Sequence, residues 1–370
     1  PFGTTCYEWT HQPADLQEAT LDTLKESPFN KIRMCVLPKH MCYNNNEPEY
    51  FPFLQAEDGS WDVHKPNADY WRNLDCRISQ LAALDIEVDL ILFHPYDRWG
   101  FSELSAEDSL IYLDYCIARL AAYYNVWWSL GNEYDLIFSK EMRDWEALAT
   151  HIRKTDPYHH LLSIHHCLVP YPKVEWMSHC SIQGDPEKVQ SWQSKYQIPV
   201  VIDECGYEGD IEFHWGSITA FEMVHLFWCA VTRGGFCTHG ETFYNEDEIL
   251  WWAKGGKLHG ESVPRIQFLK NILESLPGNL DFYIGMQPQD PNKKDDEITD
   301  NSFVKKLMSL PEKERDEKSI EIMPRIIGNE FCRLQYFGRR QMRFTDISVP
   351  INETYKVEIL DIWDMTRIVY

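Results

Sequence analysis

The chain has 370 residues, which is enough for one large α/β domain and a small additional domain. Its formal net charge of −23 argues against nucleic acid and anionic membrane surfaces as partners, because the mean field of the protein repels both. The sequence contains no apolar run long enough to predict a membrane span.

Short apolar segments that read as strands recur along the first 240 residues, with helix-like stretches between them. This alternation predicts parallel strands joined by crossover helices. The eight expected strands are Gly3–Trp9, Lys31–Leu37, Glu87–His94, Val126–Glu133, Leu161–His166, His179–Gln183, Val200–Glu204 and Gly235–His239. Eight such units predict an α/β fold, a (β/α)8 TIM barrel over residues 1–280.

Amphipathic stretches predict the helices of this barrel. The expected helices are Leu16–Glu26, Tyr70–Leu84, Ala106–Tyr123, Lys140–Lys154, Ile218–Val231 and Val263–Leu276. An insertion, Met41–Asn67, lies between the second strand and its helix. Loops that follow strands lie on the active-site face of a barrel, so this insertion is either a pocket wall or a plain surface loop.

After the barrel the composition changes. Residues 281–318 are charged and poor in large apolar residues, which predicts a linker or exposed loop. Alternation returns in residues 319–370, where Phe331–Phe337 and Tyr355–Trp363 read as half-buried antiparallel strands. We therefore expect a small C-terminal antiparallel β-domain. The chain stops on the apolar residues Ile368, Val369 and Tyr370, so this domain could be incomplete.

Two of the expected strands end in a glutamate. Glu133 ends the strand that contains Trp127 and Trp128, and Glu204 ends Val200–Glu204. In a parallel barrel all such ends converge on one face, so the two carboxylates are expected to meet across one pocket. Paired carboxylates suggest hydrolysis of a glycosidic bond. We expect apolar neighbours to raise the pKa of Glu133, and Arg33 to keep Glu204 ionised.

These motifs resemble a known superfamily. Trp128 to Glu133 and Asp203 to Gly209 are similar to the signature of clan A of the retaining glycoside hydrolases, and to a little-characterised bacterial branch with accessory β-domains. The resemblance implies that Glu133 is the acid and base and Glu204 the nucleophile. It also implies that Asn132 binds the sugar 2-hydroxyl and that Arg33 touches the nucleophile.

The sequence also departs from the pattern of this clan. Tyr134 stands where many members have proline, and the sixth strand lacks the tyrosine that donates to the nucleophile. Gln183 or Tyr207 would then have to donate the hydrogen bond to the nucleophile. The two glutamates are 71 residues apart, which predicts short helices after the fifth and sixth strands, with room for one of them to be a single turn.

Further candidates could bind the substrate or could equally belong to the core. His94, His165 and His239 lie near strand ends, and Glu241 is a sugar ligand, a salt-bridge partner of Arg33 or Lys254, or a replacement nucleophile. Tryptophans stack on sugar rings when they face a cleft, and some are simply core residues. The candidates for stacking are Trp99, Trp176, Trp215, Trp251 and Trp252.

Other functions fit the sequence less well. Histidines cluster between His159 and His179, but no HExxH or other spaced ligand set supports a metal-dependent hydrolase, so no metal is expected. No glycine-rich phosphate loop is present and no cofactor is expected. The main alternative is a catalytically inactive carbohydrate-binding barrel. The expected partner is a carbohydrate. Exo action on short β-linked oligosaccharides is favoured over endo action, and the sequence predicts neither the sugar nor the oligomeric state.

The 11 cysteines predict the compartment. They are odd in number, form no CxxC pair, and several lie in apolar runs, among them Cys35, Cys167, Cys205 and Cys237. This pattern predicts buried free thiols and hence a reducing, cytoplasmic location. The chain opens on Pro1 without an initiator methionine, so a removed signal peptide is the alternative.

Overall fold

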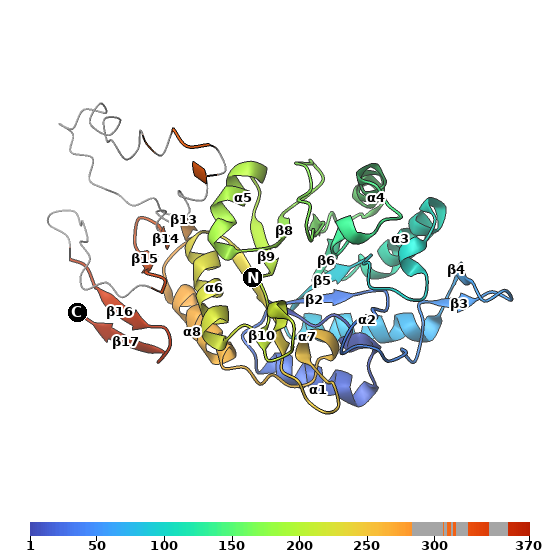
Figure 1. Ribbon diagram of the computed structural model, residues 1–370, viewed down its shortest axis with the longest axis horizontal. Coiled ribbons are helices and arrows are strands. Elements are labelled where there is room, and N and C mark those ends of the chain that lie inside the picture. The colour runs from blue at the N-terminus through green and yellow to red at the C-terminus, as the bar shows by residue number, and fades with distance from the viewer. Residues whose placement is uncertain (283–305, 307–308, 312–313, 316–324, 340–353) are drawn as a thin grey trace.

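Eight parallel strands form the central sheet of the computed structural model (Figure 1), which describes residues 1–282, 306, 309–311, 314–315, 325–339 and 354–370. They are β1 (Phe2–Thr5), β2 (Lys31–Cys35), β5 (Glu87–Ile91), β6 (Val126–Ser129), β7 (Leu162–Ser163), β8 (Cys180–Gln183), β9 (Val200–Glu204) and β11 (Phe236–His239). The sheet has the order β7-β6-β5-β2-β1-β11-β9-β8. A parallel bridge between His165 and Ser181 joins its two edges, so the predicted barrel is confirmed.

The strands are buried on both faces, because helices cover the outside and side chains fill the inside. β2 illustrates this: all five of its residues are buried, and the charged Lys31 and Arg33 alternate with apolar Ile32 and Met34. The apolar side chains belong to the main hydrophobic core. The charged ones meet acidic partners inside the barrel, and they prepare the floor of the site described below.

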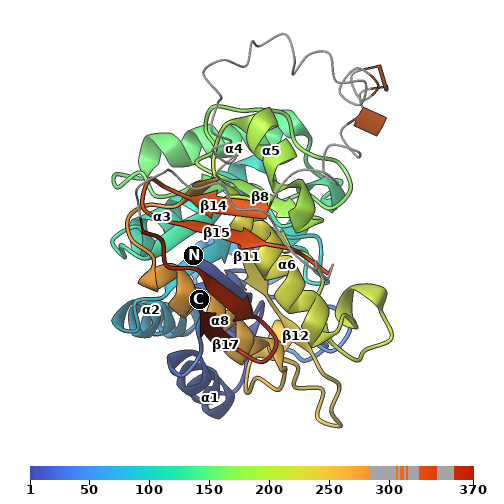
Figure 2. The same cartoon turned by 90° about the vertical axis from the view of Figure 1, so that its left-hand side faces the viewer.

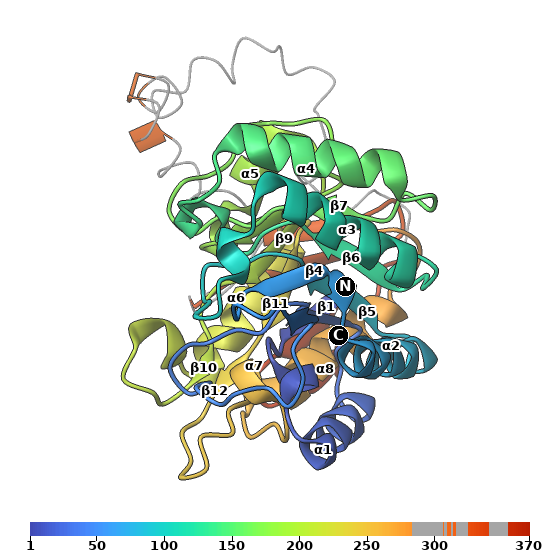
Figure 3. The same ribbon diagram turned by 90° about the vertical axis from the view of Figure 1, so that its right-hand side faces the viewer.

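Helices follow most of the strands. They are α1 (Ala14–Lys25), α2 (Ala68–Ala83), α3 (Ala106–Leu120), α4 (Met142–Thr155), α5 (Val189–Tyr196), α6 (Ala220–Thr232), α7 (Trp251–Lys254) and α8 (Ser262–Ser275). Figure 3 shows α1 to α4 following one another around one side of the barrel. Side-chain caps fix several starts: Asn67 accepts from the Asp69 amide before α2, and Ser105 accepts from the Asp108 amide before α3. Within the described residues no helix is both long and apolar enough to cross a bilayer.

The unit between β7 and β8 differs from the predicted short helix. Residues 164–179 form a helix-free connection, and the helix after β8, α5, has 8 residues. Arg153 on α4 holds this connection by donating to the Trp176 carbonyl at 2.9 Å, and Asp135 accepts from the amides of Cys167 and Val169 at 2.7 and 2.8 Å. Side-chain hydrogen bonds thus replace the helix that would normally satisfy the backbone here.

The insertion after β2 forms a hairpin of β3 (Phe53–Gln55) and β4 (Trp61–Pro66), at the right-hand end of Figure 1. Its tryptophan ring, Trp61, stacks on Phe101 at a centroid distance of 5.1 Å and donates to the carbonyl of Trp99 at 2.8 Å. The hairpin is therefore fixed to the segment that precedes α3. A further pair of two-residue strands, β10 (Glu208–Gly209) and β12 (Glu241–Thr242), runs beside the mouth of the barrel.

The C-terminal part contains two small antiparallel sheets, as predicted. β13 (Asp281–Phe282), β14 (Arg325–Gly328) and β15 (Arg333–Tyr336) form one, and β14 and β15 contact α6. β16 (Glu358–Asp361) and β17 (Thr366–Val369) form the other, next to α8 (Figure 2). The two strands expected from the sequence lie in different sheets. Most of the expected charged linker, residues 281–318, lies outside the described residues.

Candidate active site

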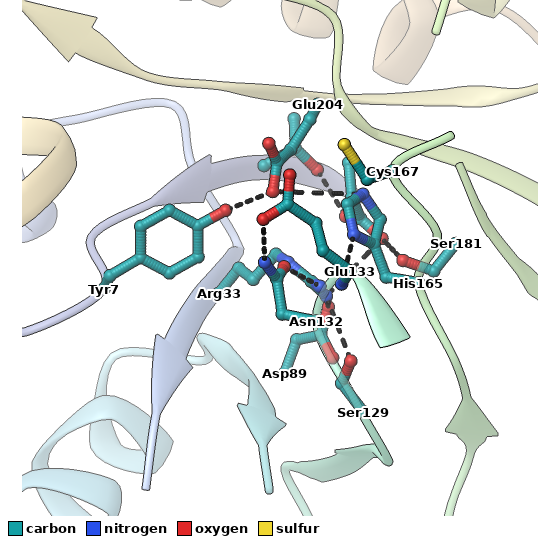
Figure 4. A network of polar contacts seen from close by, with 12 residues as sticks. Tyr7, Arg33, Asp89, Ser129, Asn132, Glu133, His165, Cys167, Ser181 and Glu204 are labelled. Carbon is teal, nitrogen blue, oxygen red and sulfur yellow. Dashed lines mark hydrogen bonds and ion pairs between the residues drawn. The ribbon is translucent and has the colours of Figure 1, made fainter. Parts of the chain in front are cut away.

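Glu133 and Glu204 come from the ends of two separate barrel strands, β6 and β9, and their carboxylates point toward one another (Figure 4). Glu204 ends β9, and Glu133 follows β6 after three residues, Leu130, Gly131 and Asn132. Both line one cavity of about 590 Å³. The side chain of Glu204 is 12% exposed, and Glu133 is 4% exposed. Two mostly desolvated carboxyl groups therefore share one pocket.

The backbone of Glu133 is in the left-handed region, with φ 48° and ψ 51°. This conformation is unfavourable for a residue with a Cβ and is found at functional sites that the surrounding structure holds in place. The surroundings do so here: the Glu133 amide donates to Nδ1 of His165 at 3.3 Å, and the Tyr134 amide donates to the His165 carbonyl at 2.9 Å. The strained turn aims the Glu133 side chain into the cavity.

Three donors converge on the carboxylate of Glu133. Tyr96 donates its hydroxyl to Oε2, and Nδ2 of Asn132 lies 3.3 Å from the same oxygen. The amide nitrogen of Gln183, oriented toward its acceptors, lies 3.2 Å from Oε1 of Glu133 and 3.2 Å from the carbonyl of His166. The network fixes the position of this carboxyl group before any ligand arrives.

Glu204 has a different set of neighbours. The hydroxyl of Tyr7, at the end of β1, donates to Oε1 of Glu204, and the hydroxyl of Tyr207 lies 3.4 Å from that of Tyr7. His165 accepts the Glu133 amide at Nδ1, so its Nε2 carries the proton and faces Oε1 of Glu204 at 3.9 Å. The tyrosine donor to Glu204 is thus Tyr7, whereas the sequence had left this role to Gln183 or Tyr207.

The pKa of Glu204 is raised to about 7, first because the group is buried and then because Glu133 repels its negative charge. Tyr7, Arg33 and Lys39 act in the opposite direction but are outweighed. This runs against the expectation that Arg33 keeps Glu204 fully ionised. Near neutral pH, Glu204 of the free protein is therefore present in both its protonated and its ionised form.

Arg33 lies beneath the pair and does not touch Glu204. It is fully buried and donates to Asp89 at 3.0 Å, to Ser129 at 3.2 Å, and to Oδ1 of Asn132 at 2.8 Å. Arg33 therefore orients Asn132, which leaves the Asn132 amide group facing the cavity. The resemblance had placed Arg33 directly on the nucleophile; here it acts on Glu204 through its charge alone.

The floor of the site is a buried ionic network. Lys31 contacts Asp203, and its Nζ lies 3.1 Å from Asp89. Asp203 also accepts from Ser181 at 2.6 Å and from Thr238 at 2.9 Å. Although burial opposes ionisation, Lys31 and Arg33 hold the pKa of Asp203 well below its usual range. Charges on the floor are thus balanced and rigid, which preorganises the carboxyl pair above them.

The other sequence candidates divide into those that line the cavity and those that do not. Asn132, Gln183 and Tyr207 line it, as do Trp215 and Trp252, whose ring centroids are 5.2 Å apart. Arg33, His94, His165, His239, Glu241 and Trp251 do not line it. His94 donates to the carbonyl of Leu37 at 3.0 Å, and Trp251 donates to the hydroxyl of Thr4 at 2.8 Å. Trp99 and Trp176 lie outside the lining as well.

Glu241 is held by backbone amides and not by Arg33 or Lys254. It accepts from the amides of His259 and Gly260 at 2.7 and 2.9 Å, and Nε2 of His239 lies 3.5 Å from its Oε1. Glu208 beside it accepts from the amide of Glu261 at 2.9 Å. Both carboxylates fix the segment that leads into α8, so Glu241 is committed to the structure of this loop.

Several cavity residues were not among the candidates from the sequence, and Tyr7, Lys39 and Tyr96 are the ones that lie around the carboxyl pair. Each follows a barrel strand by a few residues, which is where the carboxyl ends of parallel strands place functional groups. Tyr7 lay inside the expected strand Gly3–Trp9, and Tyr96 follows His94 by two residues. From the insertion Met41–Asn67 only Met41 lines the cavity.

Two groups of side chains in the described part of the chain combine metal-ligand residue types. One is Glu187, His225 and Cys229, and the other is Glu208, His239 and Glu241. Glu187 is already paired with Arg233 at 2.7 Å and with Arg325, which leaves little negative charge for a cation. In the second group the carboxylates of Glu208 and Glu241 already accept hydrogen bonds from backbone amides of residues 259–261. Neither group includes Glu133 or Glu204. The reaction proposed below uses side chains and water.

Comparison with known proteins extends these observations. Residues 3–278 match a family model described as the apiosidase-like catalytic domain, and residues 322–368 match a domain of unknown function, DUF5605. A comparison with curated protein sequences finds no match. The family match covers the whole barrel and confirms the resemblance to a bacterial branch of glycoside hydrolase barrels that the motifs indicated.

Two solved structures from Bacteroides vulgatus ATCC 8482 have related folds. One, provisionally assigned as a glycoside hydrolase, is 39% identical and covers 76% of this chain with a TM-score of 0.72. The chain spans 58% of the length of that protein. The other, a glycoside hydrolase of family 5, is 17% identical with a TM-score of 0.55, over 75% of this chain and 68% of its own, and it shows the fold alone.

Proposed function

The chain belongs to the family of apiosidase-like catalytic domains, and on this basis we propose that it is a retaining glycoside hydrolase that cleaves β-linked glycosides by double displacement. The observation that carries the proposal is the pair Glu133 and Glu204, whose carboxyl groups face each other across one cavity. Each has its own tyrosine donor. A hydrolase of this kind needs one carboxyl group that can be protonated and one that can attack.

In the first step Glu204 attacks the anomeric carbon while the glycosidic C–O bond breaks and Glu133 gives its proton to the leaving oxygen. The product is an ester between Glu204 and the sugar. In the second step Glu133 takes a proton from water, the water oxygen attacks the anomeric carbon, and Glu204 leaves as a carboxylate. The reactive form therefore has the single proton of the pair on Glu133.

The surrounding donors support this distribution of charge. The Tyr7 hydroxyl and the positive charges of Arg33 and Lys39 all favour the ionised form of Glu204. They have the greatest effect when Glu204 regains its negative charge in the second step. Asn132, oriented by Arg33, presents its amide beside Glu133 and is placed to bind the hydroxyl next to the anomeric carbon.

The wall of the cavity favours a neutral substrate. Of its five carboxyl groups, Glu187 is paired with Arg233 and Arg325, and Glu222 is paired with Arg339. Glu133, Asp185 and Glu204 remain, against the single further basic side chain of Lys39. An anionic sugar would meet net repulsion in such a cavity. Trp215 and Trp252 supply flat apolar surface on one side, which suits the face of a sugar ring.

The test is intact-mass spectrometry after incubation with 2-deoxy-2-fluoro glycosides that carry good leaving groups, followed by peptide mapping. We expect a covalent adduct on Glu204 and none in Glu204→Gln. Hydrolysis of a glycoside with inversion of the anomeric centre would contradict the double displacement. Binding of sugars to the wild-type protein without any hydrolysis would instead favour the inactive carbohydrate-binding barrel.

A further inference from the structure

Lys39 enters the active-site cavity from the loop that follows β2. Both polar atoms of the peptide group that joins Lys39 to His40 are held: Nδ2 of Asn44 donates to the Lys39 carbonyl at 2.7 Å, and the His40 amide donates to the Tyr96 carbonyl at 2.8 Å. Lys39 is 4% exposed and lines the cavity. The position of Lys39 is therefore set by the fold, unlike that of a flexible lysine on the surface.

The ammonium group of Lys39 rests on aromatic rings. Its Nζ lies 3.5 Å from the ring centroid of Tyr7, 4.4 Å from that of Tyr96 and 5.2 Å from that of Trp252. No carboxylate of the described residues lies within 4.0 Å of it, whereas the buried Lys31 contacts Asp89 and Asp203. A nearly buried lysine without an acidic partner is uncommon in proteins, which points to a function.

The two nearest rings belong to the tyrosines that hold the two catalytic carboxyl groups. Tyr7 donates to Glu204 and Tyr96 donates to Glu133. We propose that Lys39 is a positioning residue for the proposed reaction, whose ammonium group polarises both tyrosine hydroxyls and so stabilises negative charge on the carboxyl pair. It acts through Tyr7 and Tyr96 and through its charge, and the proposal rests on the proposed function for the roles of Glu133 and Glu204.

The physical reason is the interaction between a cation and a π system. An ammonium group over a phenol ring is attracted to the negative ring face and draws electron density away from the hydroxyl. The O–H group then becomes a stronger donor, and its hydrogen bond to a carboxylate strengthens. The positive charge of Lys39 also lowers the pKa of Glu204 directly, against the larger effects of burial and of Glu133.

Few of the groups around Lys39 and Glu204 change charge near neutral pH. Burial lowers the pKa of His94 and His165, and it raises the pKa of the thiols and phenols on all sides. The neighbours with raised pKa values are Tyr7, Cys35, Cys42, Tyr96 and Tyr207. The charge of the site near neutral pH is thus decided by Glu133, Glu204, Lys39 and Arg33.

A titration of the free protein tests the proposal without a substrate. The δ-carbon shifts of glutamates in the ¹³C-labelled full chain would be followed against pH, with Glu204 assigned from Glu204→Gln. In Lys39→Met we expect Glu204 to titrate about one pH unit higher than its wild-type value. Lys39→Arg keeps the charge and should restore the lower value. Unchanged titration of Glu204 in Lys39→Met would overturn the proposal.

Lys195 provides a matched control, because its Nζ lies 4.7 Å from the ring centroid of Tyr196 but it does not line the cavity. Lys195→Met should leave the titration of Glu204 unchanged, and an equal shift in this variant would contradict the proposal. Melting temperatures check that each variant is folded, and Lys39→Gln serves as a second uncharged variant if Lys39→Met does not fold.

Kinetics then separate positioning from substrate binding. In Lys39→Met we expect the acidic limb of the plot of kcat/KM against pH to move to higher pH, by the same amount as the Glu204 titration. A raised KM with an unmoved acidic limb would assign Lys39 to substrate binding and overturn the proposal. Lys39→Met could shift the Glu204 titration while the wild-type protein hydrolyses no glycoside. That result would support the electrostatic role of Lys39 and overturn the proposed function.

Discussion

The hydroxyl of Tyr7 donates a hydrogen bond to Oε1 of Glu204, although 197 residues separate the two in the chain. Tyr7 follows β1 and Glu204 ends β9, two strands that flank β11 in the barrel. A matching contact joins Tyr96 to Glu133. Each carboxyl group of the pair therefore has a phenol donor from a different strand end, and this arrangement leads to the following predictions.

Tyr7→Phe should lower kcat by about 10- to 100-fold, because it removes a hydrogen bond to a charged group worth about 1.5–3 kcal/mol. Tyr207→Phe is the matched comparison, since the Tyr207 hydroxyl contacts that of Tyr7 at 3.4 Å and not the carboxylate. Tyr207→Phe should lower kcat by a clearly smaller factor than Tyr7→Phe. Steady-state kinetics of both variants on one aryl glycoside would check this, and equal losses would argue against a special role of Tyr7.

Glu204→Gln should stabilise the protein at high pH. Burial and Glu133 raise the pKa of Glu204 from 4.5 to about 7 in the folded state. Below pH 4.5 the carboxyl group is protonated in both the folded and the unfolded state. Between pH 4.5 and about 7 only the unfolded chain ionises, so the Glu204 carboxyl lowers stability increasingly over this range, and above it the loss stays constant. The variant should gain about 1–3 kcal/mol near pH 8 and almost nothing near pH 4.

Urea unfolding at the two pH values measures this difference. Glu57→Gln is a suitable control, because Glu57 is exposed in the turn of the β3–β4 hairpin and does not line the cavity. Its free energy of unfolding should respond little to the substitution. A Glu204→Gln variant that is destabilised at both pH values would show that its hydrogen bond to Tyr7 outweighs the cost of burying its charge.

Glu133→Ala should discriminate between substrates by their leaving groups. Without the acid, the leaving oxygen departs unprotonated, so poor leaving groups should lose about 10²- to 10⁴-fold in kcat/KM. Activated aryl glycosides need little protonation and should lose far less in this first step. A series of aryl glycosides with graded leaving-group pKa values measures the dependence, and a uniform loss across the series would remove Glu133 from the role of acid.

Arg33→Met should destabilise the fold by about 3–5 kcal/mol, because it leaves the buried Asp89 without a full set of cationic partners. Arg72→Met is the control: Arg72 pairs with Asp69 at the same 3.0 Å, but their side chains are 71% and 60% exposed. We expect that variant to lose about 1 kcal/mol or less. Thermal or urea unfolding of both variants gives the comparison, and similar losses would contradict it.

The sequence by itself determined the barrel and the two glutamates. Apolar runs of strand length alternate with amphipathic stretches, and this local pattern is enough to predict parallel strands whose ends meet on one face. Because Glu133 and Glu204 lie directly at such ends, their meeting in one cavity follows from the fold class alone. The predicted strands and the antiparallel sheets after the barrel rest on the same kind of local signal.

Only the tertiary structure decided which side chains surround the pair. Tyr7, Lys39 and Tyr96 reach the cavity from three different strand ends, whereas Trp251 turns into the core toward Thr4. Such choices depend on the rotation of each strand and the path of each loop, and residue spacing does not record them. The same holds for the pKa of Glu204, which depends on burial and on the distance to Glu133, because electrostatic energies depend on positions in space and not on separation along the chain.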